Sequence, residues 1–371
     1  MHVDFLNSFS LTDRALTLAG LAPFVLMGCA VHESPVVAAT QALPPPSYRE
    51  LMPVPVPPPR PRPPAALVAS IDALRDRFDG LAGIAVRSCE GGWSAESADA
   101  DRRLPQQSVS KLWVAMTVLD AVDAGRMRLD DPVTVTRADL TLFHQPIAAL
   151  ALKPGGYRTT VRDLLHRALT GSDNTANDRL LALVGGPAKV RAFLSRNALG
   201  DIRFGPGERD LQAKTAGLTW QPRFSQGGEF EAARSRLPQA TRRAAYQSYV
   251  ANPPDGASPA AIANALAKLK RGAILSPTST AYLLSTMADT RTGRARMKAA
   301  VPRGWSLGHK TGTGQDLLGR TAGFNDVGIL TAPDGRSYAI AVMIGDTSRP
   351  VRERQALIQQ VVAAVVANHR G

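Results

Sequence analysis

Cysteine is scarce in this sequence of 371 residues, and histidine is sparse. The two cysteines, Cys29 and Cys89, cannot form a disulfide framework that would hold a fold together. The six histidines are dispersed, and no Cys/His cluster has the spacing of zinc ligands. Stability must therefore come from an apolar core, and a folded part of about 300 residues buries enough surface to form one.

Acidic residues are also too few to balance the basic ones, and the net charge is +13. Such a charge favours anionic partners or surfaces. The arginines are scattered, however, and no basic run is interleaved with aromatic side chains, so nucleic-acid binding is not expected. Hydrophobic residues at 44% and charged residues at 20% are typical of a globular protein, and the length allows one large domain or two small ones.

No long uninterrupted apolar run is present. Residues 15–27 are apolar, but Gly20 and Pro23 interrupt them, and the stretch has the length of a signal peptide rather than of a membrane span. It ends in Leu26-Met27-Gly28-Cys29, which resembles the lipobox of bacterial lipoproteins. The resemblance implies a signal peptide over residues 1–28, lipidation of Cys29 and a membrane-tethered protein of the periplasm. A plain secretory signal, a retained anchor and a protein that is not exported remain alternatives.

Residues 29–65 are predicted to be a linker. Leu43 to Pro64 reads LPPPSYRELMPVPVPPPRPRPP, a composition that favours extended polyproline and cannot form a core. Behind an export signal, a semi-rigid tether is a better interpretation than a ligand for an SH3-type domain.

The remaining residues, 66–371, are predicted to fold with strands at both ends of a helical region. Helices are expected at 65–78 and 351–368, and strands at 81–87, 304–311, 323–331 and 337–345, with mostly helical patterns between residues 108 and 271. This order indicates an α+β fold in which helices flank an antiparallel sheet, with an additional all-helical subdomain.

A candidate nucleophile begins one of the helical patterns. In Ser108-Val109-Ser110-Lys111, the apolar spacing that follows predicts a helix starting at Ser108, which places Ser108 and Lys111 on the same face. An amine with a lowered pKa can take the proton of a serine hydroxyl, which is a poor nucleophile alone. The motif by itself is weak, since an exposed helix start would give the same pattern.

Two further motifs follow in order, Ser172-Asp173-Asn174 before a helix and Lys310-Thr311-Gly312 after a strand-like run. The set S-x-x-K, S-D-N and K-T-G resembles the penicillin-binding proteins and class A serine β-lactamases. The resemblance covers most of residues 66–371.

The resemblance implies a role for each matching residue. Ser108 is the nucleophile and Lys111 its base, or a partner that orients it. Ser172 passes a proton to the leaving nitrogen, and Lys310 supplies positive charge. The implied substrate-binding residues are Asn174, Thr311 and Thr313, and the backbone amides of Ser108 and Thr313 form the oxyanion hole.

Glu208 begins a sequence similar to the E-x-x-L-N element of class A enzymes, with Gln212 in place of the usual asparagine. It lies 36 residues after Ser172, which agrees with the class A spacing. The resemblance makes Glu208 the base for deacylation, whereas the alternative is a surface glutamate. It also places Phe143 on the wall of the cleft. Arg296 takes the position of an arginine that pairs with the substrate carboxylate, unless it is a surface arginine.

Three features depart from the family pattern. Asp178 stands where an amide residue usually supports the glutamate, and two neighbouring carboxylates cannot both ionise cheaply. Residues 213–258 form an unusually long link, with a helix expected at 238–249. Residues 315–324 lengthen the turn after Lys310-Thr311-Gly312.

The sequence therefore predicts a class A β-lactamase that hydrolyses the β-lactam ring through a serine acyl-enzyme and confers antibiotic resistance. No metal or cofactor is expected, and the protein is expected to be a monomer. A D-Ala-D-Ala carboxypeptidase of the penicillin-binding type and a non-catalytic envelope protein are the alternatives.

Overall fold

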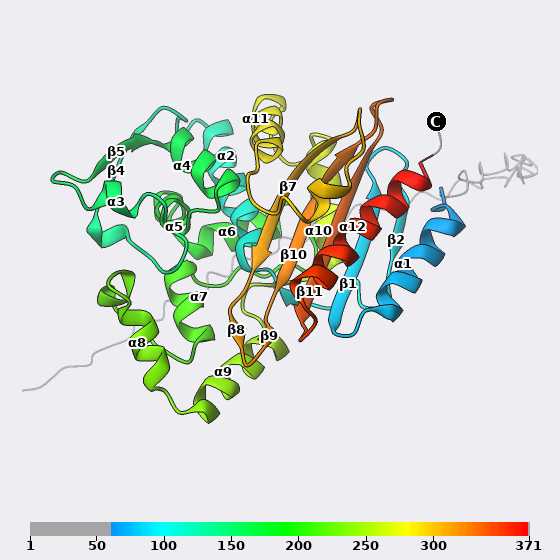
Figure 1. The fold of residues 1–371 in the computed structure, drawn as a ribbon. Helices are drawn as coiled ribbons and strands as arrows, with labels where there is room; N and C mark the ends of the chain where they lie inside the picture. The colour runs from blue at the N-terminus through cyan, green and yellow to red at the C-terminus, as the bar shows by residue number, and fades with distance from the viewer. Residues whose placement is uncertain (1–60, 370–371) are drawn as a thin grey trace, which may run out of the picture. The chain divides into compact units, whose positions relative to one another are not determined.

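A five-stranded antiparallel sheet lies at the centre of the structure, a computed structural model that describes residues 61–369 (Figure 1). The strands follow the order β2-β1-β11-β10-β7. Their bounds are Leu81–Ser88 for β1, Ser94–Glu96 for β2, Ser306–Thr313 for β7, Phe324–Thr331 for β10 and Ser337–Asp346 for β11. The signal peptide predicted for residues 1–28, Cys29 and most of the predicted linker lie outside the described residues.

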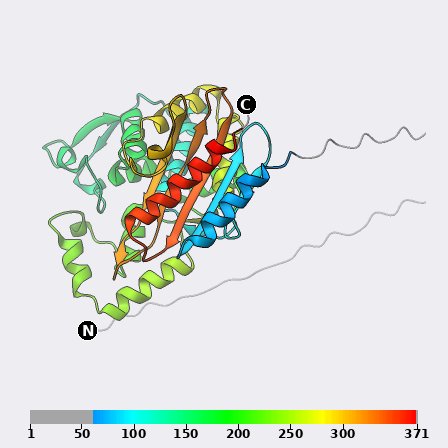
Figure 2. The same cartoon turned by 45° about the vertical axis from the view of Figure 1, so that its right-hand side comes forward.

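Both faces of this sheet are covered. Helices α1 (Ala65–Arg77) and α12 (Val351–Ala367) lie over one face, as Figures 1 and 2 show, and α10 (Pro259–Lys270) packs against the other. Alternate residues of β11 serve the two faces: Ile340 and Val342 join the core beneath α1 and α12, whereas Ala339 and Ala341 face α10. Burial on both faces explains the nearly continuous apolar sequence of β11.

The other elements form a helical region beside the sheet, together with short strand pairs. The helices are α2 Lys111–Asp123, α3 Ala148–Ala151, α4 Val161–Thr170, α5 Asn174–Leu183, α6 Pro187–Arg196, α7 Glu208–Thr215, α8 Glu229–Arg236, α9 Gln239–Ala251 and α11 Pro277–Ala288. The short strands are β3 Leu104–Pro105, β4 Pro132–Val135, β5 Tyr157–Thr160, β6 Gly256–Ala257, β8 Asp316–Leu317 and β9 Arg320–Thr321. The predicted α+β fold with a helical subdomain is confirmed.

Helix α2 passes through the middle of the helical region with nearly every side chain buried. It begins at Lys111 rather than at Ser108 as expected, because a short 3-10 turn, Gln107–Ser110, precedes it. Gln107 has a φ of 53°, which is incompatible with a continuous helix. Ser108 therefore lies on a turn at the head of a buried helix.

The long link over residues 213–258 contains two helices. One is α9, close to the helix expected at 238–249, and the other is α8, which was not anticipated. Residues 315–324 contain the β8–β9 hairpin, which extends the β7–β10 connection toward α9. Cys89 is a buried free thiol whose pKa burial raises to about 12. None of the helices within residues 61–369 is both long and apolar enough to cross a membrane.

Candidate active site

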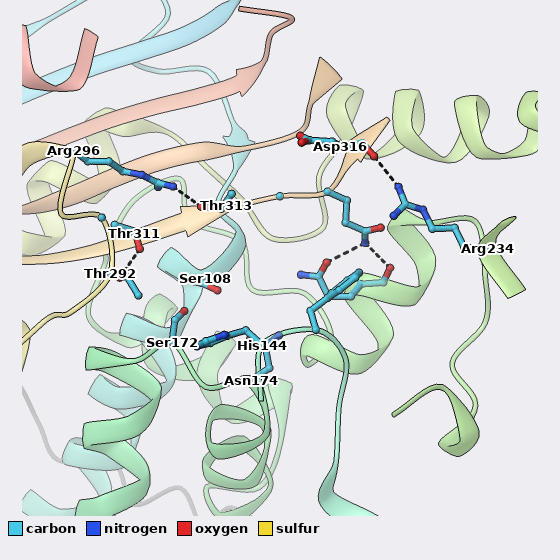
Figure 3. Close-up of a pocket in the computed structure, with 15 residues that line it drawn as sticks. Ser108, His144, Ser172, Asn174, Arg234, Thr292, Arg296, Thr311, Thr313 and Asp316 are labelled. Atoms are coloured by element: carbon cyan, nitrogen blue, oxygen red, sulfur yellow. Dashed lines mark hydrogen bonds between the residues drawn. The ribbon is translucent and has the colours of Figure 1, made fainter. Parts of the chain in front are cut away.

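A cavity of about 480 Å³ opens beside the edge of β7, where the 3-10 turn before α2, the loop before α5 and helix α7 meet (Figure 3). Residues of all three sequence motifs reach it. Its lining is Ser108, Phe143, His144, Ser172, Asn174, Gln212, Arg234, Thr292, Gly293, Arg296, Thr311, Thr313, Gly314, Gln315 and Asp316.

The turn that carries Ser108 is held close against β7. A Cβ at Gly312 would come within 2.2 Å of the carbonyl oxygen of Gln106, so only glycine fits the third position of the K-T-G motif. Gln107, Phe143 and Ser172 adopt left-handed backbone conformations with φ of 53–58°. Such strain, on the order of 1–3 kcal/mol for each residue, is typical of active sites. All three strained residues therefore lie in or beside one cavity.

The ammonium of Lys111 joins the nucleophile to the glutamate. Lys111 Nζ donates to Ser108 Oγ at 2.9 Å, and it also donates to Glu208 Oε1. The side chains of Lys111 and Glu208 are 0% and 3% exposed, so this ion pair is removed from water. A buried pair is weak evidence for stability, because desolvating both charges is costly. Because Lys111 also contacts the Ser108 hydroxyl, the pair is better explained by a catalytic role.

Glu208 begins α7 and is buried, so the alternative of a surface glutamate is wrong. Its second oxygen, Oε2, accepts from Gln212 Nε2 at 3.2 Å. Asp178 contacts its backbone rather than its side chain, accepting from the amides of Glu208 at 2.8 Å and Arg209 at 3.2 Å. Burial, and then the charge of Glu208, raise the pKa of Asp178 to about 6. Asp178 thus fixes the first turn of α7.

Ser172 and Lys310 form a second hydroxyl–amine pair. Lys310 Nζ donates to Ser172 Oγ at 3.0 Å and to the Thr311 carbonyl oxygen at 3.0 Å. Burial, together with the positive charge of Lys111, holds the pKa of Lys310 well below its ordinary value. Asp173 caps α5 by accepting from the amide of Ala176 at 2.9 Å, and this cap orients the loop that carries Ser172.

Asn174 and Phe143 line the other wall of the cleft. Asn174 Nδ2 donates to the carbonyl oxygen of Leu142 at 2.8 Å, which fixes the side-chain amide beside the cavity. The ring of Phe143 is 42% exposed at the cleft and stands edge-on to Phe230 of α8, with the ring centroids 5.2 Å apart. The long link therefore supports this wall from behind.

Arg296 is buried against β7 and is not a surface arginine. Its guanidinium donates to the carbonyl oxygens of Gly312 at 3.1 Å and Asn325 at 2.6 Å, and to Thr313 Oγ1 at 2.5 Å. Burial lowers the pKa of Arg296 to about 10. Thr311 Oγ1 lies 2.7 Å from the hydroxyl of Thr292. Lys310, Arg296 and these hydroxyls give one end of the cavity the character of a carboxylate-binding site.

Several residues at the cavity carry no motif. Arg234 of α8 donates to the Asp316 carbonyl oxygen at 2.7 Å, and Figure 3 shows this pair at the end of the cavity opposite Arg296. Gln315 Nε2 donates to Gln212 Oε1 at 3.0 Å. His144 also lines the cleft. No local pattern marks these residues in the sequence. Within residues 61–369 no group of three His, Cys, Asp or Glu side chains could hold a metal ion.

The geometry contains the parts required for acyl transfer through a serine. Ser108 has a lysine amine within hydrogen-bonding distance, that lysine also contacts a carboxylate, and a second hydroxyl, that of Ser172, accepts a hydrogen bond from Lys310. All five residues predicted as catalytic and all five predicted to bind substrate lie in or around one cleft.

Comparison with known proteins gives concordant results. Residues 66–369 match the family described as the beta-lactamase enzyme family. The extended-spectrum beta-lactamase PER-1 of Pseudomonas aeruginosa is 31% identical over 259 residues, 70% of this chain and 73% of that protein. Beta-lactamase VEB-1 of the same organism is 26% identical over 70% of this chain and 76% of its own length.

Solved structures resemble the fold along most of the chain. A beta-lactamase from Chitinophaga pinensis superposes with a TM-score of 0.66 at 27% identity, covering 80% of this chain and 97% of that one. The TLA-1 extended-spectrum beta-lactamase gives a TM-score of 0.66 at 26% identity, with 82% and 98% covered.

Proposed function

We propose that this chain, which belongs to the class A serine β-lactamases of the beta-lactamase enzyme family, hydrolyses β-lactams through an acyl-enzyme on Ser108 with Glu208 as the base for deacylation. One observation supports this assignment above the others: Lys111 Nζ contacts both Ser108 Oγ and Glu208 Oε1. The contact connects the nucleophile with a carboxylate that can activate water for hydrolysis of the acyl-enzyme. A penicillin-binding protein, which forms a stable acyl-enzyme, has no need of such a carboxylate.

In acylation, Ser108 Oγ attacks the lactam carbonyl carbon. A proton that moves from Lys111 to Glu208 leaves a neutral amine, which accepts the proton of the Ser108 hydroxyl. The carbonyl oxygen becomes negative and is held by the backbone amides assigned to the oxyanion hole, those of Ser108 and Thr313. As the ring C–N bond breaks, Ser172 gives its proton to the leaving nitrogen, while Lys310 donates to the same hydroxyl. The proton that Lys111 took from Ser108 then replaces the one that Ser172 lost, and Glu208 returns its proton to Lys111, so the acyl-enzyme forms with Glu208 ionised.

In deacylation, Glu208 takes a proton from water, and the resulting hydroxide attacks the ester carbonyl. The tetrahedral intermediate collapses by breaking the bond to Ser108 Oγ, which recovers its proton from Lys111, and Glu208 passes the proton that it took from water to Lys111. Gln212 holds Glu208 Oε2 on one side, which fixes the plane of the carboxylate toward the ester. A general base placed in this way contributes typically 10²–10⁴-fold.

The two ends of the cleft bind different parts of the substrate. Thr311, Thr313 and Arg296 line the end that receives the carboxylate carried by β-lactams, and the buried Lys310 adds positive charge behind Ser172 and Thr311. Asn174 receives the amide of the acyl side chain, and Phe143 forms the wall beside it. The remainder of that side chain extends toward Gln315 and Arg234, contributed by the β8–β9 hairpin and α8.

The assignment is tested with residues 66–371 and a chromogenic cephalosporin, comparing the unmodified protein with Ser108→Ala and Glu208→Gln. We expect turnover to fall at least 10³-fold in both variants, with mass spectrometry detecting a covalent adduct only in Glu208→Gln. A long-lived adduct on the unmodified protein would instead indicate an enzyme of the penicillin-binding type. If no variant formed an adduct, the protein would be a non-catalytic envelope protein.

We also propose that Cys29 becomes the lipidated N-terminus of a monomeric, membrane-tethered periplasmic protein. The lipobox-like Leu26-Met27-Gly28-Cys29 and the polyproline spacer behind it support this proposal. Expression in a Gram-negative host with fractionation and mass spectrometry is the test. Cys29→Ser should move the protein from the membrane to the soluble fraction, whereas an unmodified Met1 terminus would contradict the proposal.

A further inference from the structure

Helix α9 of the long link brings a tyrosine beneath the turn that carries the nucleophile. Tyr249 is 5% exposed, and its hydroxyl lies 2.6 Å from Gln107 Nε2 and 3.1 Å from Asp255 Oδ2. The same carboxylate oxygen accepts from the backbone amide of Gln107 at 2.8 Å. Tyr249 and Asp255 thus hold both the backbone and the side chain of the residue that precedes Ser108.

The hydrogen bonds form one chain with a defined direction. Burial and the charge of Asp255 hold the pKa of Tyr249 well above its ordinary value, so the hydroxyl keeps its proton and donates it to Asp255. It must then accept from Gln107 Nε2, which turns Gln107 Oε1 toward Gln212. Gln212 Nε2 donates to Gln107 Oε1 at 3.0 Å and to Glu208 Oε2 at 3.2 Å.

A side-chain amide in this chain has only one orientation that satisfies its neighbours. If the Gln107 amide rotated, its NH₂ group would face the NH₂ group of Gln212, and Gln212 could no longer donate to both Gln107 and Glu208. Without the tyrosine hydroxyl, the remaining acceptor for Gln107 Nε2 is the carbonyl oxygen of Ala322 at 3.4 Å. This contact is long, so it holds the amide poorly.

We propose that Tyr249 is a positioning residue for deacylation, acting through Gln107 and Gln212 on the carboxylate of Glu208. The inference rests on the proposed β-lactamase mechanism and adds to it a role for the long link. Acylation uses Ser108, Lys111 and the Oε1 atom of Glu208 that Lys111 holds, whereas the chain from Tyr249 reaches only Oε2 of Glu208. Loss of the hydroxyl should therefore slow the hydrolysis of the acyl-enzyme more than its formation.

Slower deacylation has a kinetic signature that simple loss of folded protein lacks. When hydrolysis of the acyl-enzyme limits turnover, kcat and KM fall together and kcat/KM stays constant, whereas a smaller folded fraction lowers kcat alone. Decay of the acyl-enzyme after rapid mixing, followed by quenched-flow mass spectrometry, measures the step directly. Both measurements use the full chain.

The test variant is Tyr249→Phe, and the same helix offers a matched control. Tyr246 is also buried, and its hydroxyl donates to the carboxylate of Asp346 at 2.6 Å, outside the chain that leads to Glu208. We expect Tyr249→Phe to lengthen the acyl-enzyme lifetime about tenfold while kcat/KM changes less than twofold. Tyr246→Phe should leave the lifetime unchanged. An unchanged lifetime in Tyr249→Phe, or equal lengthening in both variants, overturns the proposal.

A second variant covers the case in which Tyr249→Phe does not fold. Gln107→Met removes the amide link but leaves the contact between Tyr249 and Asp255, and it should lengthen the lifetime to a similar degree. If both variants fold, the double variant should be no slower than either single one, and additive effects would contradict a shared route. Failure of Glu208→Gln to accumulate acyl-enzyme would refute the proposed function itself, which distinguishes the two failures.

Discussion

At the scale of single residues, the chemistry of the cleft depends on two ammonium groups, those of Lys111 and Lys310, buried behind its wall. Lys310 Nζ contacts a serine hydroxyl and a backbone carbonyl, and no carboxylate lies within 4 Å of it among the residues described. Burial and the charge of Lys111 therefore lower its pKa without a compensating ion pair. Positive charge at this position is therefore lost at a lower pH than on an exposed lysine.

This lowered pKa predicts the alkaline limb of the pH profile. Substrate with a carboxylate needs the charged form of Lys310, so kcat/KM should decline as pH rises through the lowered pKa of the free enzyme, below the ordinary lysine value of about 10.4. Lys310→Arg places a group of intrinsically higher pKa at this position and should shift the limb to higher pH, at the cost of a lower maximum rate. If the alkaline decline of kcat/KM occurs at the same pH in Lys310→Arg, the decline is caused by the titration of another group.

At the scale of elements, the parts that the sequence predicted are those with local signatures. The apolar runs of β10 and β11, the apolar face of α12 and the three short motifs each depend on neighbouring residues, and the motifs meet because β7 and the heads of α2 and α5 converge. The helix start at Ser108 was wrong by three residues, because the strained φ of Gln107 is set by contacts with Asp255 and Tyr249 rather than by local propensity.

The long link shows why the rest could not be predicted. Tyr249 and Gln107 are separated by 142 residues, and neither belongs to a motif. Helix α8 is short and rich in charge, so its apolar contact through Phe230 is too brief to produce a periodic pattern. Its effect on the cleft depends on packing against Phe143. Because the long link has no counterpart in the family pattern, the resemblance to the family could not predict these contacts.

At the scale of the whole molecule, two buried carboxyl groups beneath the site lower the stability of the fold at neutral pH. Asp178 and Asp255 both lie beneath it, fully buried, and burial raises the pKa of each to about 6 from a model-peptide value near 3.8. The folded chain therefore holds two protons over a pH range in which the unfolded chain has released them. Both carboxylates anchor the backbone around catalytic residues, Asp178 at Glu208 and Asp255 at Gln107.

The sign of the pH dependence follows from these shifts. Because the folded pKa values are higher than the unfolded ones, the contribution of Asp178 and Asp255 to stability is complete below about pH 4 and is lost as the pH rises through about 6. Carboxylates with lowered pKa values, such as Asp163, act in the opposite direction, so the total slope mixes both effects. The contribution of one buried group is isolated by the difference between the unmodified protein and a variant.

We therefore expect urea unfolding between pH 4 and pH 7 to show that the stability of the unmodified protein relative to Asp255→Asn decreases as pH rises, by an amount on the order of a few kcal/mol. Asp178→Asn should behave in the same way. A relative stability that increases with pH for Asp255→Asn would mean that this carboxylate is stabilised in its charged form, as an ion-paired group is. In that case the buried anchor beneath Ser108 would support the fold at neutral pH instead of costing it stability.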